Sequence, residues 1–452
     1  MKKLAVYIIL ALYCLAPVTA IDFGGIFEID YYGLIDPTTF YESERIRLTL
    51  ATEISGRSKS RWLDFHLSGL LYAQPIGEPA FVELERIVRE AYLGLHFSIF
   101  DINIGQKFVN WGKVDILSPL NIINHSDTTV LSLDNILEGS LPDPMVQVQV
   151  YLADSFNLEI VYVPFLQPNI YPVEEILINE YLELDIPPLK KKIFDLDAAF
   201  INTEIKPFSE LANSIHIAAN YTSYLFDLIA SYSWSVDQAL DFDLSGIEEE
   251  ITEFPDRDEH LIRGTAFPAY NRIHNIGAGV SFYLRNLLIS ADSALKITRD
   301  WDGSRMEIKN SELFSTIQVE RMFLNRVRVQ LNLFHKYVFN YSAQLQSTYG
   351  PFMRVYINAV IDDYLLQKPQ SQVYILAHFD THFFRERLLL GGNFIYGYTE
   401  KAYYIIPRIA YKLSDYLSIS AGADIWIKGT AEGLLGRNET RDNFFIRMQL
   451  AW

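Results

Sequence analysis

Three consecutive polar residues, His125-Ser126-Asp127, have the side-chain types of a base, a nucleophile and an orienting carboxylate. Such groups hydrolyse esters only when they converge in space, and adjacent residues cannot form that relay on their own. The sequence has no Gly-x-Ser-x-Gly motif, and loops rich in Asn, Ser and Asp are typical of turns. We therefore expect no enzyme activity and keep an outer-membrane hydrolase as the less favoured alternative.

The residue types that bind metals are scattered along the sequence. The nine histidines form no His-Glu-x-x-His motif, and the one cysteine, Cys14, lies in an apolar N-terminal segment. The acidic stretch 241–259 could attract divalent cations through its carboxylates, but it departs from the EF-hand loop pattern. We expect a solvated acidic loop there, with no catalytic residues, no metal site and no cofactor.

Charged residues recur at a spacing of two beside apolar ones, which would place them on one face of a strand. Rings of Arg or Lys favour anions in a pore, and rings of Asp or Glu favour cations. Both signs are present, so selectivity stays open; the alternative is salt bridges that only hold the wall. The predicted pore-lining or solute-binding residues are Arg45, Arg47, Asp64, Asp101, Lys107, Arg326 and Arg328.

The elements that would carry these residues are strands. The segment from Arg326 to Tyr341 places Val327 and Val329 on one face and Arg328 and Gln330 on the other. Similar segments run for nine to twelve residues, the length of a tilted transmembrane strand. An arginine facing lipid near the midplane would cost about 2–4 kcal/mol, so the polar face is expected to face the lumen.

Nineteen such segments recur along the chain, one of them at 194–205. Unpaired sheet edges in lipid would leave backbone groups unsatisfied, so the sheet must close. Because single-chain bacterial barrels have even strand numbers, we predict an all-β fold, an antiparallel up-and-down barrel of about 18 strands (14–18) with long extracellular loops.

The N-terminus predicts export. Lys2 and Lys3 precede an apolar run from Leu4 to Leu15, and a small-residue site ends at Ala20. We expect a signal peptide at 1–20 and one barrel domain at 21–452, in the outer membrane of a two-membrane bacterium. The formal net charge of −18 argues against a nucleic-acid partner.

The last strand ends on an aromatic residue, Trp452, after alternating Phe444, Ile446, Met448 and Leu450. This ending resembles the C-terminal signal that the barrel insertion machinery recognises. The expected partners are therefore outer-membrane lipid, that machinery and a small polar solute.

The stretch 101–127 interrupts the alternation and predicts a constriction or rim motif, formed by Gly105, Trp111, Gly112, Asp115 and Asp127. Glycine in a strand allows close approach of another backbone, and a tryptophan at a strand end favours the membrane interface. The alternative is a structural bulge with an interface tryptophan.

These residues, with Gln106 and either Asn121 or Asn124, match a motif of porin-like outer-membrane proteins of the alginate-export type and their uncharacterised relatives. His125 departs from it, where those proteins have proline. The resemblance covers most of the chain in layout and about forty residues in motif. The resemblance implies a large barrel that passes or exports a polar solute. We therefore expect passive transport of a polar solute, anionic or saccharide-like, through a channel. The alternative is a structural envelope barrel or surface adhesin with a plugged lumen.

Overall fold

The structure is a computed structural model. It describes residues 18–34, 45–58, 62–76, 80–81, 87–126, 140–165, 167–169, 213–239, 241–243, 247–254, 257–264, 267–303, 308–341, 370–427, 429 and 442–452. The predicted strand at 194–205 and the motif residue Asp127 lie outside these residues. Among the described residues, no helix is long and apolar enough to cross a membrane.

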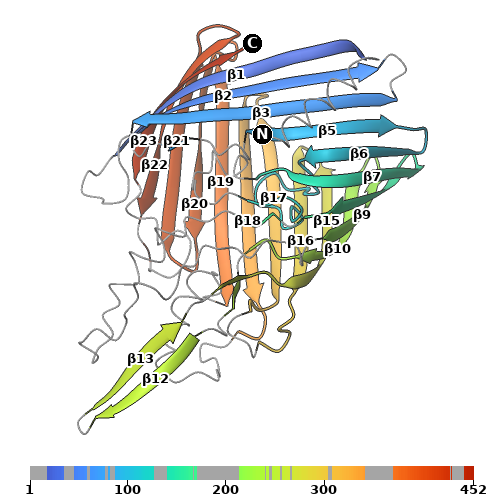
Figure 1. The fold of residues 1–452 in the computed structure, drawn as a ribbon. Coiled ribbons are helices and arrows are strands. Elements are labelled where there is room, and N and C mark those ends of the chain that lie inside the picture. Colours follow the sequence, from blue (N-terminus) through green and yellow to red (C-terminus); the bar gives the residue numbers. More distant parts are fainter. Residues whose placement is uncertain are drawn as a thin grey trace.

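Eighteen antiparallel strands form a closed barrel, as predicted (Figure 1). The first strand closes the ring by pairing with the last, in register from Ile26 opposite Ala451 to Leu34 opposite Asn443. The strands are β1 (Val18–Leu34), β2 (Arg45–Ser58), β3 (Leu63–Ile76), β5 (Val88–His96), β6 (Phe100–Lys107), β7 (Asp143–Ala153), β8 (Phe156–Val163), β9 (Ser214–Thr222), β10 (Phe226–Val236), β15 (Arg272–Leu284), β16 (Leu287–Ile297), β17 (Glu312–Phe323), β18 (Val327–Val338), β19 (Ser371–Phe383), β20 (Leu388–Gly397), β21 (Ala402–Lys412), β22 (Leu417–Ile427) and β23 (Asn443–Ala451).

Five short elements lie outside the ring of eighteen. The two-residue strand β4 (Ala80–Phe81) pairs with β3. Between β10 and β15, β11 (Asp241–Asp243) pairs with β14 (Phe267–Ala269), and β12 (Ile247–Phe254) pairs with β13 (Arg257–Gly264). The prediction of a plain acidic loop at 241–259 is therefore wrong, because this segment forms strands. The β12–β13 hairpin projects beyond the barrel (Figure 1).

The two ends of the barrel differ. At one end, short turns join consecutive strands, such as Arg285-Asn286 between β15 and β16, and the C-terminal Trp452 lies there against Gly25. We call it the short-turn end. At the other, the long-loop end, connections such as 108–142 and 237–271 join the strands. This asymmetry is typical of outer-membrane barrels, whose short turns face the periplasm.

The two faces of the wall follow the predicted alternation. On β18, Leu331 and Leu333 point outward and are exposed, whereas Gln330 and Asn332 point into the lumen and are buried. On β17, the outward Ile317 is exposed beside the inward, buried Gln318. An apolar outer belt is the surface that lipid requires, and a polar inner face suits a lumen. The predicted orientation of these strands is confirmed.

Candidate functional site

The segment after β6 folds into the barrel rather than away from it. We call residues 108–126 the inner loop. It forms hydrogen bonds with the inward faces of β16, β17 and β18. In the ring of eighteen strands, β16 lies six positions from β6, so the inner loop crosses the lumen. Figure 1 shows it as the teal trace inside the ring of strands.

The departure from the wall begins at Gly105. Its φ of +141° is a conformation that side chains disfavour, and a Cβ there would lie 2.1 Å from the carbonyl oxygen of Ala91 on β5. Two asparagines then shape the chain: Asn124 accepts from the Val109 amide (2.7 Å) and donates to the Lys107 carbonyl (3.0 Å). These contacts turn the backbone inward directly after the strand.

The second asparagine, Asn121, folds the tip. Its side-chain oxygen accepts hydrogen bonds from the amides of Trp111 (3.0 Å) and Gly112 (2.9 Å). Gly112 is packed so closely that a Cβ would lie 2.5 Å from the Ser118 Cβ. The motif glycine therefore permits a compact tip.

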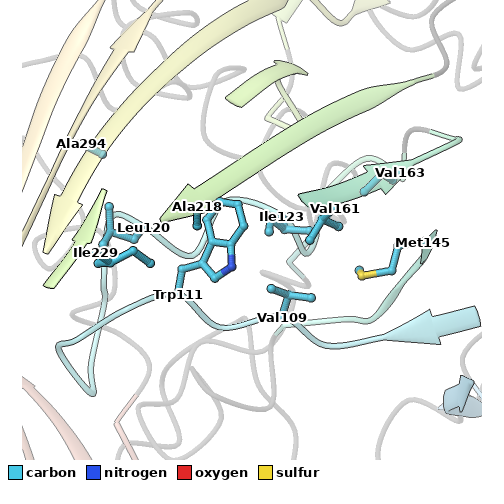
Figure 2. Packing of buried hydrophobic residues seen from close by; sticks show 10 residues of the cluster. All are labelled: Val109, Trp111, Leu120, Ile123, Met145, Val161, Val163, Ala218, Ile229 and Ala294. Carbon is cyan, nitrogen blue, oxygen red and sulfur yellow. The ribbon is translucent and has the colours of Figure 1, made fainter. Parts of the chain in front are cut away.

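Apolar side chains of the inner loop pack against apolar side chains of the wall (Figure 2). Trp111 is 4% exposed and lies in this cluster, so its predicted place at the membrane interface is wrong. Leu120 fills space over β15, where a Cβ on Gly277 or Gly279 would collide with it. The cluster consists of Val109, Trp111, Leu120 and Ile123 from the loop and Met145, Val161, Val163, Ala218, Ile229 and Ala294 from the wall.

One carboxylate of the wall fixes the tip. The Oδ2 atom of Asp292 on β16 accepts hydrogen bonds from the amides of Lys113 (2.9 Å) and Val114 (3.0 Å). It also accepts from the Ser118 hydroxyl at 2.6 Å. Nearby, the Thr316 hydroxyl donates to the Leu117 carbonyl (3.1 Å). Bonds to a charged acceptor are among the stronger ones in proteins, so Asp292 acts as a latch for the inner loop.

Asp115 connects the same tip to β17 and β18. Its amide donates to the Gln318 side chain (2.9 Å), which in turn donates to the Asp115 carboxylate (3.0 Å). Arg328 donates to Asp115 (3.1 Å) and to Glu320 (2.8 Å). Two predicted residues, Asp115 and Arg328, thus meet across the lumen.

A polar band covers the opposite inner wall, from β3 to β8. Lys107 lies over the Tyr92 ring, with its Nζ 4.8 Å from the ring centroid, and donates to Gln147 (2.8 Å). Gln147 also accepts from Asn103 (3.0 Å) and donates to Glu159 (2.6 Å). Lys107 is therefore held by a neutral amide and an aromatic face.

Histidine 96 links the predicted residues Asp64 and Asp101. Its Nε2 lies 2.9 Å from Asp64 Oδ2 and its Nδ1 lies 3.1 Å from Asp101 Oδ1. The Tyr151 hydroxyl donates to Asp101 at 2.7 Å. In addition, Arg57 approaches Asp64 at 3.5 Å. The two carboxylates are thus parts of one network rather than isolated pore charges.

Arg47 lies where the barrel closes. It donates to Asp30 on β1 (3.2 Å), and Arg447 on β23 donates to the same carboxylate (2.7 Å). Arg447 also lies 3.2 Å from Glu28. Asp30 is fully buried. Arg47 therefore forms its ion pair beside the junction between the first and last strands.

The remaining predicted residues lie elsewhere. Arg45 begins β2, where its backbone is opposite Tyr32, but its side chain is outside the described part of the structure. Arg326 lies in the exposed turn between β17 and β18, because β18 begins one residue later, at Val327. Sequence reasoning missed Asp292 and Gln318, whose only signal was a polar residue on an inward face.

His125 pairs with Asp143 of β7, not with its neighbours. The His125 Nδ1 lies 3.1 Å from Asp143 Oδ1, and the His125 amide donates to Oδ2 (2.9 Å). The Ser126 amide donates to Asn169 (2.7 Å). These contacts anchor the end of the inner loop. Among the described residues, no group of three or more His, Cys, Asp or Glu is arranged to hold a metal ion.

A charged cluster lies at the long-loop end, just beyond β10. Asp237 contacts Lys296 (2.9 Å) and Lys309 (3.2 Å), and Lys309 lies 3.6 Å from Asp241. Burial alone would raise the pKa of Asp237, but the two ammonium groups bring it well below its usual range. Burial raises the pKa of Asp241, against the attraction of Lys309.

Comparison with known proteins supports the fold. The structure is similar to OccK11 (OpdR) of Pseudomonas aeruginosa, with a TM-score of 0.50 and 9% identity over 95% of each chain. The chain has a porin-like β-barrel fold. Lower TM-scores relate it to Salmonella typhi OmpF in complex with daunomycin (0.43, 12% identity, 96% of this chain and 97% of that one) and to a triple mutant of the Rhodopseudomonas blastica porin (0.41, 11%, 96% and 100%). No family model matches the sequence, and no curated protein sequence matches it.

Proposed function

We propose that this protein is an outer-membrane channel for passive transport of a small polar solute, and that it is not an enzyme. The observation that carries the proposal is the inner loop, which crosses the lumen of a closed 18-strand barrel and is fixed to the far wall. Barrels of 16 to 18 strands enclose an aqueous channel. A loop held inside one narrows that channel.

Side-chain exposure supports an open path past the inner loop. The side chains of Glu53 and Arg57, both on the inward face of β2, are 59% and 56% exposed. The Asp115 side chain at the loop tip is 54% exposed. Water therefore reaches both the wall at β2 and the tip. This favours a channel over the alternative of a plugged envelope protein or adhesin.

For the solute, the geometry favours cations over the anions expected from the arginine pairs. Arg47 and Arg328 are both neutralised by carboxylates. The described inward-facing cations of β2, β3, β5, β6, β7 and β8 are Arg47, Arg57 and Lys107. The inward-facing acids of the same strands are Glu53, Asp64, Glu90, Asp101, Asp143 and Glu159, twice as many. Since acidic rings favour cations, this wall would repel an anionic solute.

Ion selectivity of the purified full chain in planar bilayers tests the proposal. Under a salt gradient, the reversal potential is expected to show cation preference. The substitution Glu53→Gln should reduce that preference, because Glu53 is exposed in the lumen and its ion-pair partner among the described residues is His66, at 3.5 Å. Glu386→Gln is the matched control, since Glu386 lies in an exposed turn outside the lumen. Absence of conductance would refute the channel, whereas anion preference would refute only the assigned solute class.

The route to the membrane is part of the same proposal. A signal peptide at 1–20 would leave a chain that begins at Ile21, within β1. The final strand pairs with β1, and the backbone of Trp452 exchanges hydrogen bonds with Gly25 (3.1 and 3.2 Å). Recognition of Trp452 by the barrel insertion machinery predicts that removing this residue lowers the amount of assembled barrel.

A further inference from the structure

Basic side chains gather on one half of the short-turn end. They lie in the turns after β15, β17 and β19 and near the ends of β17 and β21, which follow one another around the rim. All are exposed, and only two exposed acids, Glu386 and Asp415, lie among them. On the other half, the turns after β5, β7 and β9 contain no basic residue, and Arg57 at the end of β2 points inward and lies 3.5 Å from Asp64. The basic side chains are Arg285, Arg321, Arg326, Arg385, Arg387 and Lys412.

Arg321 is the most informative of them. It occupies an outward position of β17, and its cross-strand neighbours are Leu287 on β16 and Val329 on β18. Its guanidinium lies 4.6 Å from the centroid of the Phe323 ring, which faces the same side. Among the described residues it has no carboxylate partner. An exposed cation on the outer face, stacked on an aromatic ring, is available to pair with an anion from outside the chain.

The adjacent turns show where that anion lies. Leu324 is 91% exposed and Phe384 is 73% exposed, each within a turn that also carries arginine. Arg285 and Arg385 adopt φ values of +57° and +59°, where glycine or asparagine would be less strained. Apolar tips beside unpaired arginines are the pattern of a surface at the boundary between lipid tails and headgroups.

We propose that this basic arc binds the phosphates of anionic phospholipids in the leaflet at the short-turn end, with Arg321 and Arg326 at its centre. Guanidinium groups match phosphate oxygens in bidentate geometry. Neighbouring hairpins in a sheet are about 10 Å apart, so the arc presents several phosphate contacts along the rim. An acidic protein would find the same charges, but the outward position of Arg321 favours lipid.

The test uses the purified full chain in detergent, titrated with a fluorescent phosphatidylglycerol and, separately, with phosphatidylcholine. Arg321→Gln/Arg326→Gln should weaken phosphatidylglycerol binding about 25-fold, since each arginine near an anionic surface contributes about fivefold. The matched control is Arg299→Gln/Lys401→Gln, which removes two exposed cations from the long-loop end. Arg321→Lys keeps the charge and should lose less than Arg321→Gln.

Equal binding of the two lipids by the wild type, or unchanged affinity in the Arg321→Gln/Arg326→Gln variant, would overturn the proposal. So would an equal loss in the control variant. Channel conductance reports separately on the barrel: both double variants should conduct like the wild type, because none of the four side chains is placed in the lumen network. A variant that conducts normally is folded, so its lipid affinity can be interpreted.

Discussion

Removing the carboxylate of Asp292 should release the inner loop. All three of its hydrogen bonds, from Lys113, Val114 and Ser118, end on the same oxygen, Oδ2. The other oxygen, Oδ1, is buried and has no hydrogen-bond partner among the described residues. Asp292→Ala therefore removes the acceptor of three donors at once. Asp292→Asn, with its amide oxygen in the Oδ2 position, keeps an acceptor for all three.

The size of the effect follows from these contacts. A buried donor left without a partner costs about 1–3 kcal/mol. Three donors that share one acceptor are not independent, so we take about 3–6 kcal/mol for the alanine variant. At 1.4 kcal/mol per factor of ten, the docked state would lose about two to four orders of magnitude relative to the undocked state. The apolar packing of Leu120 and Trp111 remains and opposes release.

Single-channel conductance measures the outcome. Asp292→Ala is expected to give larger or strongly fluctuating conductance, because an undocked inner loop no longer narrows the lumen. Asp292→Asn should stay close to the wild type, although it removes the same charge. Wild-type conductance in the alanine variant would show that apolar packing alone holds the loop. An equal change in both variants would assign the effect to charge and refute the latch.

Two further predictions concern assembly and pH. Gly105→Ala should greatly reduce assembled, heat-modifiable barrel on gels, because its Cβ would lie 2.1 Å from the Ala91 oxygen, whereas Gly24→Ala, whose Cβ would lie 3.5 Å from its nearest neighbour, should assemble normally. Asp237 is buried, and Lys296 and Lys309 bring its pKa below the usual range. The stability that its ionised carboxylate contributes is therefore fully present above about pH 4, the ordinary pKa of an unfolded aspartate, and is lost as the pH falls toward the folded-state pKa. The difference in melting temperature between the wild type and Asp237→Asn should therefore narrow below pH 4; a constant difference from pH 7 to pH 3 would contradict the assignment.

The wall of the barrel was predictable because it obeys a local rule. Each strand must alternate apolar and polar residues to separate lipid from lumen, and that period is visible in any window such as Val327 to Leu333. Strand ends were predicted within a few residues, since turns such as Arg285-Asn286 interrupt the alternation. The segment 241–259 was misjudged, because its carboxylates suggested solvated loop while the backbone pairs Glu250 with Leu261 in a hairpin.

The sequence indicated a constriction after β6, but it could not predict where the inner loop would lie, for a physical reason. Its decisive donors are backbone amides, at Lys113, Val114 and Asp115, and every residue except proline has one. Its acceptors, Asp292 and Gln318, lie some 180 to 200 positions away along the chain and look like any other polar residue on an inward face. Trp111 shows the same ambiguity: an indole after a strand suits the membrane interface as well as a buried cluster. Only the path of the backbone, set by Gly105 and the two asparagines that turn it, decides between lipid and lumen. In the proposed channel, selectivity therefore depends less on which charges line the wall than on which of them the inner loop leaves uncovered.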